Sequence, residues 1–173
     1  MTSALQRRCR RVALVATAAA MAACGGGDDD EATPRARFEL GPASPAAHAG
    51  RLEAAPDSGA SLEWRPADGI SAVPYCLLRF TDLRHANGSS YLMGIAFAAA
   101  DRRVLVVTLS NRETSWLVAA FNPPQAEAAV DRRERRLTLR ALRSTQGMQV
   151  GWEATLSGQA AIPAAAAGSS ACD

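Results

Sequence analysis

The sequence contains no lysine, so all 19 of its basic residues are arginine, against 17 acids. The resulting formal charge of +2 argues against a dedicated nucleic-acid-binding protein, which concentrates basic residues on one face. No apolar run reaches the roughly 20 residues of a membrane-spanning helix. Aromatic residues make up only 5% of the chain, but the hydrophobic fraction of 48% excludes a wholly disordered protein.

Residues with versatile chemistry are also scarce, with 2 histidines and 4 cysteines. The chain has no nucleophile elbow, no phosphate-binding Walker loop, no zinc-protease helix and no dinucleotide fingerprint. We therefore expect no cofactor and no metal, and the sequence favours a protein that is not an enzyme. His48 lies in a Pro/Ala-rich stretch and His85 in a turn, where surface histidines are commoner than catalytic bases.

The first 23 residues have the layout of a bacterial export signal. Arg7, Arg8, Arg10 and Arg11 form a positive region, and residues 12–20 are a short apolar stretch. The motif Met21-Ala22-Ala23-Cys24 follows, and a glycine triplet and an acidic run come after it.

This segment resembles a bacterial lipoprotein precursor, in which small residues precede a cysteine that receives a diacylglycerol. The resemblance covers only the first 24 residues and implies that the chain is cut before Cys24, which then carries the acyl chains. The partner is then the lipid bilayer of the bacterial cell envelope. Gly25 in place of aspartate implies the outer membrane, by the sorting rule of enteric bacteria. The alternative is an ordinary secretory signal cut after Ala22, which leaves Cys24 as a plain thiol.

Removal of residues 1–23 changes the charge and the cysteine count. These residues hold four of the 19 arginines and none of the 17 acids, so the remainder carries a formal charge of −2. Cys9 leaves with the signal and Cys24 is consumed by acylation, so only Cys76 and Cys172 remain. In an exported protein this predicts a Cys76–Cys172 disulfide, which stabilises the fold by on the order of 4 kcal/mol in the chain-entropy model.

The remaining chain divides into three parts. Residues 24–36 read as a flexible acidic tether and residues 164–173 as a loose C-terminal tail. Residues 37–163 form the predicted β domain. Its first part, residues 37–60, is rich in proline and glycine, and we expect it to be loosely structured, with a short edge strand at 37–40 and another strand at 51–54.

From residue 61 onward, apolar and polar residues alternate with a period of two, which indicates half-buried strands. The predicted strands cover residues 61–64, 75–82, 91–97, 103–110, 116–121, 137–141 and 148–157. Asn87-Gly88 marks a hairpin turn, and Leu142 breaks the alternation as a β-bulge does. Residues 125–136 fit either a helical turn or a short strand. The pattern predicts an all-β fold, a single small antiparallel sandwich or barrel-like meander.

Two groups of side chains are candidates for a binding surface. Arg132, Arg133, Arg135 and Arg136 form a dense basic cluster, which either binds an anion or is a solvated turn offset by neighbouring acids. Of the three tryptophans, Trp116 and Trp152 fall at core positions of strands, which leaves Trp64 as the candidate exposed aromatic residue.

The sequence thus favours a lipid-anchored envelope protein whose β domain is a binding or structural module, with no nucleic-acid partner. An envelope protein or an anionic glycolipid is the expected ligand class. One alternative is a small envelope hydrolase that uses an acid pair such as Asp82 and Glu153. Another is an accessory subunit of an envelope assembly complex, which requires an exposed apolar patch or an unpaired edge strand.

Overall fold

The computed structural model describes residues 35–44, 46–112, 117–124, 126–144 and 153–173. The expectations for the signal segment, the tether to residue 34, Cys24, Trp116 and Trp152 lie outside these residues. All the described residues belong to one compact unit, Ala32–Asp173. No helix in the described part of the chain has the length and apolar character that a bilayer crossing requires.

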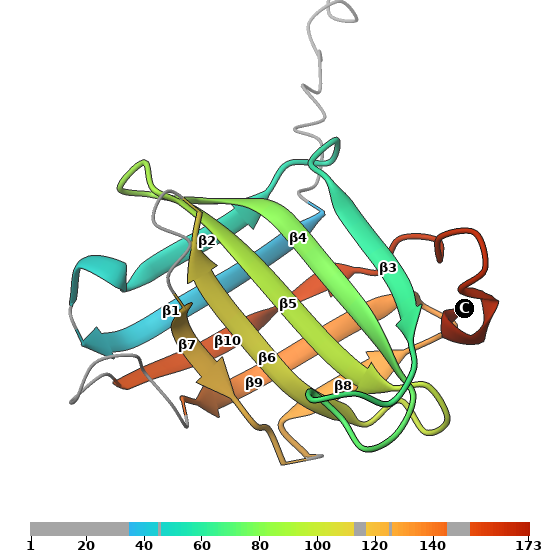
Figure 1. The fold of residues 1–173 in the computed structure, drawn as a ribbon. Helices are drawn as coiled ribbons and strands as arrows, with labels where there is room; N and C mark the ends of the chain where they lie inside the picture. Colours follow the sequence, from blue (N-terminus) through green and yellow to red (C-terminus); the bar gives the residue numbers. More distant parts are fainter. Residues whose placement is uncertain (1–34, 45, 113–116, 125, 145–152) are drawn as a thin grey trace, which may run out of the picture. The chain divides into compact units, whose positions relative to one another are not determined.

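Ten strands form one antiparallel sheet (Figure 1). They are β1 (Ala36–Ser44), β2 (Gly50–Ala54), β3 (Ala60–Arg65), β4 (Tyr75–His85), β5 (Ser90–Ala98), β6 (Val104–Asn111), β7 (Leu117–Phe121), β8 (Ala128–Asp131), β9 (Arg136–Arg143) and β10 (Glu153–Ala161). The spatial order is β7-β6-β5-β4-β2-β1-β10-β9-β8, and β3 pairs separately with β4. Most neighbours in the sheet are therefore neighbours in the sequence, as in a meander.

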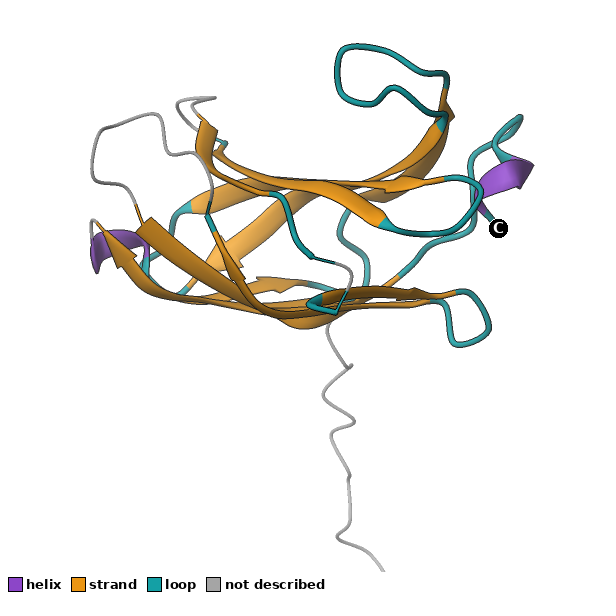
Figure 2. Ribbon diagram, turned by 90° about the horizontal axis from the view of Figure 1, so that it is seen from below, coloured by secondary structure: helices purple, strands orange, loops and turns teal. Residues whose placement is uncertain are grey.

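The sheet curls into a half-barrel, and its two halves face each other across the core (Figure 2). The curl depends on β1, which pairs with β2 on one side and with β10 on the other, so that the first and last strands join the two halves. The all-β antiparallel fold predicted from the alternation is thus confirmed.

The buried face of each strand follows the sequence alternation. Tyr91, Met93, Ile95 and Phe97 on β5 are all at most 1% exposed, and they pack in one cluster with Cys76, Leu78 and Phe80 of β4. The turn at Asn87-Gly88 joins these two strands, and the Gly88 amide donates a hydrogen bond of 2.9 Å to the His85 carbonyl. The predicted hairpin is correct in its strands, its turn and its buried face.

A β-bulge on β9 changes which side chains face the core. Leu137 and Leu139 are buried, Ala141 adopts a φ of 49° and is exposed, and Leu142 is buried again. The register against β10 shifts at the same place. The bulge predicted from the phase break at Leu142 is confirmed.

Residues 37–60 differ from the loosely structured segment that we expected. They contain most of β1, a short 3₁₀ helix η1 (Ala46–His48) and β2. Instead of an edge strand, β1 is an interior strand of nine residues, because Phe38 and Leu40 are buried in the core and both of its edges are paired. The ambiguous stretch at 125–136 contains strand β8 followed by a turn.

The C-terminal tail lies against the outer edge of β3. The Ala166 amide donates to the Leu62 carbonyl at 2.9 Å, and the Trp64 amide donates to Ser169 Oγ at 2.9 Å. A 3₁₀ helix η2 (Ser170–Cys172) then follows. The tail thereby satisfies main-chain groups of a strand that pairs with only one other strand.

Candidate functional site

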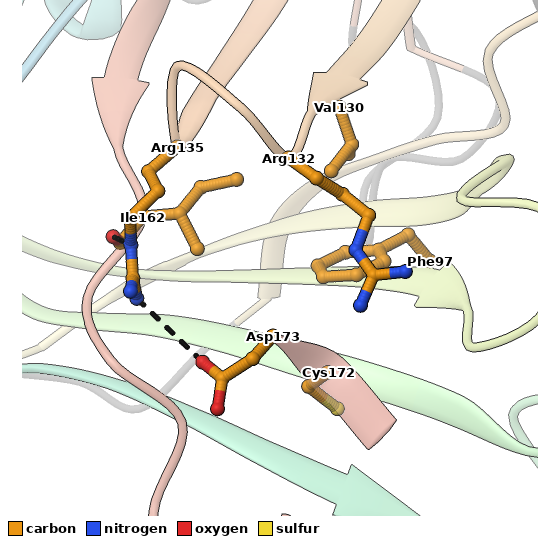
Figure 3. Close-up of a pocket in the computed structure, with 7 residues that line it drawn as sticks. All are labelled: Phe97, Val130, Arg132, Arg135, Ile162, Cys172 and Asp173. Atoms are coloured by element: carbon orange, nitrogen blue, oxygen red, sulfur yellow. Dashed lines mark hydrogen bonds and ion pairs between the residues drawn. The ribbon is translucent and has the colours of Figure 1, made fainter. Parts of the chain in front are cut away.

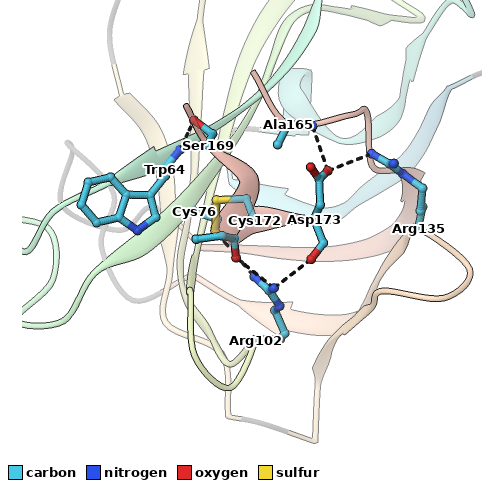
Figure 4. Close-up of a disulfide and its surroundings, with 9 residues drawn as sticks. Trp64, Cys76, Arg102, Arg135, Ala165, Ser169, Cys172 and Asp173 are labelled. Carbon is cyan, nitrogen blue, oxygen red and sulfur yellow. Dashed lines mark hydrogen bonds and ion pairs between the residues drawn. A yellow bond between two sulfur atoms is a disulfide. The ribbon is translucent and has the colours of Figure 1, made fainter. Parts of the chain in front are cut away.

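The predicted disulfide joins Cys76 on β4 to Cys172 in η2, with a Cα–Cα distance of 5.7 Å (Figure 4). Both cysteines are buried, at 0% and 5% exposure. The bond spans a sequence separation of 96 residues, and it fixes the tail next to the loop that connects β5 to β6.

Arg102, on this loop, binds the same tail. Its Nη2 donates to the main-chain oxygens of Ala171, at 3.0 Å, and Asp173, at 3.2 Å, and Nη1 lies 3.7 Å from the sulfur of Cys76. The guanidinium carbon lies 5.9 Å from the centroid of the Phe97 ring. Burial and the nearby charge of Arg132 lower the pKa of Arg102, and Asp173 partly opposes this shift. The Nε of Arg102 is buried and has no hydrogen-bond partner among the described residues.

The carboxylate of Asp173 lies between the tail and the turn that connects β8 to β9 (Figure 4). Its Oδ1 accepts a hydrogen bond of 3.1 Å from the Ala165 amide and lies 3.8 Å from Nη2 of Arg135. Both side chains of the ion pair are about half exposed, at 46% and 50%, so the pair alone contributes little to stability.

The turn at residues 132–135 divides the basic cluster into two pairs. Oδ1 of Asp131 accepts hydrogen bonds from the amides of Arg133 and Glu134, and this cap shapes the turn. Arg135 adopts a φ of 47°, and its Nε donates to the Ile162 carbonyl at 3.1 Å. Arg132 and Arg135 therefore project to the same side, toward the tail.

Arg132 and Arg135 line a small hollow with Phe97, Val130, Ile162, Cys172 and Asp173 (Figure 3). The two arginines descend from one turn on opposite sides of the hollow, and Asp173 lies below them. The volume is about 60 Å³, which holds a few water-sized groups but no whole sugar or nucleotide. We call these residues, together with the adjacent Arg102, the arginine hollow.

The other two arginines of the basic cluster do not reach this hollow. Arg136 begins β9 and lies 3.9 Å from the carboxylate of Glu134, while Arg133 is exposed on the turn. The structure thus brings together half of the predicted cluster, and it adds Arg102, which the sequence reasoning missed. No local signal indicated Arg102, because its hydrogen-bond partners in the tail lie 69 and 71 residues further along the chain.

The chain has no match in any of the comparisons. No protein family model, no curated protein and no solved structure matches the chain.

The histidines are not the lone surface residues that we expected. His85 is buried at 7% exposure and accepts a hydrogen bond at Nδ1 from the Asn87 amide, which leaves Nε2 to donate to the Ala49 carbonyl at 3.1 Å. Nδ1 of His48 lies 2.7 Å from the Tyr91 hydroxyl. Both rings pack edge-on against Tyr91. Burial, and then the charge of His85, lower the pKa of His48. The cluster joins η1 to β4 and β5.

Asp82 does not have the properties of a general acid. Its carboxylate accepts a hydrogen bond from the Ser90 hydroxyl and forms ion pairs with Arg84, at 3.0 Å, and Arg112, at 3.5 Å. The Ser90 hydrogen bond, followed by the contributions of Arg84, lowers the pKa of Asp82 despite partial burial. A general acid needs the opposite shift. Glu153, its suggested partner, begins β10, which β2 and β1 separate from β4 in the sheet, and its side chain lies outside the described part.

Metal chemistry has no support in the described ranges. No group of three or more His, Cys, Asp or Glu side chains in these ranges could hold an ion. A further feature with binding chemistry is an exposed apolar set at the end of β3 and in the loop after it: Trp64 at 38%, Ile70 at 55% and Val73 at 42% exposure. The exposed position predicted for Trp64 is confirmed.

Proposed function

We propose that this protein is a bacterial envelope lipoprotein, anchored by acylated Cys24, whose β domain is a binding or structural module. The observation that carries the proposal is the Met21-Ala22-Ala23-Cys24 motif, which stands after a short apolar stretch and ahead of a Gly/acid-rich tether. The first strand of the β domain begins at Ala36, so a tether of about a dozen residues separates lipid from domain.

The Cys76–Cys172 disulfide supports export independently of that motif. Structural disulfides persist in oxidising compartments such as the periplasm and are rare in the bacterial cytosol. The bond closes a long loop and lies in the core, as a structural disulfide does. The disulfide and the first residues of the chain therefore both support export from the cytosol.

Acylation by several chains also attaches a protein stably to a membrane. A single acyl chain holds a protein only marginally, at about 0.8 kcal/mol per buried methylene, whereas several chains anchor it stably. Gly25, directly after Cys24, favours the outer membrane as the destination. The ligand classes that the proposal allows are an anionic glycolipid or another envelope protein.

The test is membrane fractionation of the protein expressed in a bacterial host, with and without Cys24→Ala. We expect the wild-type protein to be found in the outer-membrane fraction and to be labelled by a fatty-acid precursor. The Cys24→Ala variant should carry no label. Cys9→Ala is the matched control, because it removes a cysteine of the signal segment that the proposal leaves without a role. If the wild-type protein were released into the periplasm without a fatty-acid label, this would contradict the anchor and favour the ordinary secretory signal.

A second candidate function, an accessory subunit of an envelope assembly complex, is favoured by the exposed set of Trp64, Ile70 and Val73. Exposed tryptophan and aliphatic side chains on adjoining segments are typical of docking surfaces. Substitution of Ile70 and Val73 by serine, with the protein kept in its membrane, should release any stable partner that crosslinking detects. An unchanged crosslinking pattern would contradict this role.

A further inference from the structure

We propose that the arginine hollow is a binding site for a phosphate group, with Arg132 and Arg135 as its principal ligands and Arg102 beside them. The inference deepens the proposed function by naming the ligand class. It rests on the β domain being a binding module, and it does not depend on the lipid anchor.

The arrangement of charge is the first argument. Arg132 and Arg135 border one hollow, and both belong to the turn after β8. Arg135 is partly neutralised by Asp173, whereas the side chain of Arg132 makes no hydrogen bond or ion pair with any described residue. Arg102 approaches closely enough that the charge of Arg132 acts on it. A fixed turn thus holds an uncompensated guanidinium next to two others.

The shape and lining of the hollow are the second argument. Its volume of about 60 Å³ accepts a group of phosphate size, so that a larger molecule carrying the phosphate remains outside. Its walls include Phe97, Ile162 and Cys172, which are all at most 8% exposed. An apolar wall lowers the local dielectric constant and strengthens a charged hydrogen bond. Guanidinium groups match the oxygens of phosphate with pairs of parallel donors.

Asp173 shows how an oxyanion is held at the rim of this hollow. Its carboxylate accepts a main-chain hydrogen bond from Ala165 and lies 3.8 Å from Arg135, a separation longer than a direct hydrogen bond. We infer that this side chain competes with the ligand for Arg135. Neutralising Asp173 should therefore strengthen phosphate binding, an effect that a merely structural cluster would not produce.

The test is isothermal titration calorimetry on the full chain purified in a neutral detergent. Inorganic phosphate is the first probe, and dihexanoyl phosphatidic acid in the same micelles is the second. We expect Arg132→Gln to weaken phosphate binding about tenfold or more. Arg133→Gln, which removes the same charge from the same turn but outside the hollow, should change it by less than about twofold. Asp173→Asn keeps an acceptor for the Ala165 amide and should tighten binding several-fold.

The two probes separate the sources of the phosphate. Comparable binding of both identifies a free phosphate-bearing solute, and markedly tighter binding of phosphatidic acid identifies a lipid headgroup. Each variant is also unfolded by heat, and an unchanged midpoint for Arg132→Gln excludes loss of structure, as expected for an exposed side chain. Equal weakening by Arg132→Gln and Arg133→Gln, or absence of binding by the unmodified chain, would overturn the inference. Neither result would affect the lipid anchor, which fractionation tests separately.

Discussion

Nη1 of Arg102 lies 3.7 Å from the sulfur of Cys76, on the half of the disulfide that belongs to β4. The same guanidinium binds the main chain of Ala171 and Asp173, on either side of Cys172. The tail is therefore fastened at one point by a covalent bond and by a cluster of charged hydrogen bonds around it. The arginine hollow and the disulfide therefore meet at the C-terminal end of the tail.

Loss of the disulfide should lower the free energy of unfolding substantially. In the chain-entropy model, a loop spanning 96 residues corresponds to about 4.7 kcal/mol. We expect Cys172→Ser, measured by urea denaturation under oxidising conditions, to lose a large part of this amount. Cys76→Ser, which removes the same bond from its other end, should lose a comparable amount. Equal stability of Cys172→Ser and the unmodified protein would show that the disulfide contributes nothing.

Gly158 should not tolerate any side chain. Its φ is 147°, and a Cβ built there would lie 2.3 Å from the Arg37 carbonyl oxygen and 2.6 Å from the Cα of Phe38. Since both contacts are with main chain of the paired strand β1, the sheet itself would have to shift. We expect Gly158→Ala to cost more than about 2 kcal/mol in denaturant unfolding.

The control for that substitution is Gly69→Ala. A Cβ added at Gly69 would meet no heavy atom within 4 Å, and the residue lies in an exposed loop. The same chemical change should therefore alter stability there by less than about 0.5 kcal/mol. Comparable losses at the two positions would mean that the close approach of β10 to β1 is not the cause.

Asp82 should make stability depend on pH in the acid range. Its pKa is lowered from an ordinary value near 3.8, chiefly by the Ser90 hydrogen bond, so the folded state favours the charged form. The contribution is fully present above pH 4 and is lost as the pH falls through the lowered pKa. We expect Asp82→Asn to be less stable at pH 6 by roughly 1 kcal/mol and to converge with the unmodified protein near pH 2. A difference that is independent of pH would contradict this linkage.

His48 should have the same sign of effect in a different range. Its pKa is lowered from 6.5, first by burial and then by the charge of His85, so the unfolded chain binds the proton more readily. Stability is therefore full above about pH 6.5 and falls as the pH drops below that value. His48→Gln should flatten the decline between pH 7 and 5, as measured by urea midpoints at each pH. A steeper decline in the variant would show that protonated His48 is stabilised by the fold.

The sequence predicted the strands whose alternation is uninterrupted. Tyr91, Met93, Ile95 and Phe97 define the buried face of β5 without any tertiary information, and the phase break at Leu142 was sufficient to place a bulge. The length of β1 was predicted too short. Gly41 and Pro42, directly after the buried Phe38 and Leu40, are typical of a strand end, but the strand continues past them. The local sequence pattern does not indicate that both edges of β1 are paired with other strands.

The candidate site was predicted only in part, for a different reason. The density of arginines drew attention to residues 132–136, but the direction of each side chain depends on the cap from Asp131 and on the positive φ of Arg135. The cysteine count placed Cys172 next to β4, and with it the tail. Nothing in the sequence indicated that Arg102 would meet that tail.

The histidine cluster is a further example of this limit. His48 and His85 are 37 positions apart in the sequence, and the sequence places each of them in an irregular or turn-forming segment. They contact the same Tyr91 because η1 lies beside the β4–β5 hairpin. The pairing of β2 with β4, in which Leu52 lies opposite His85, helps to bring them together.

The most direct test of the central claim is the intact mass of the protein recovered from its bacterial envelope, before and after reduction. The account predicts a chain that begins at Cys24, carries acyl chains and gains the mass of two hydrogens on reduction of the Cys76–Cys172 bond. A soluble, unacylated product, cut after Ala22 and retaining the free thiol of Cys24, would contradict the lipid anchor.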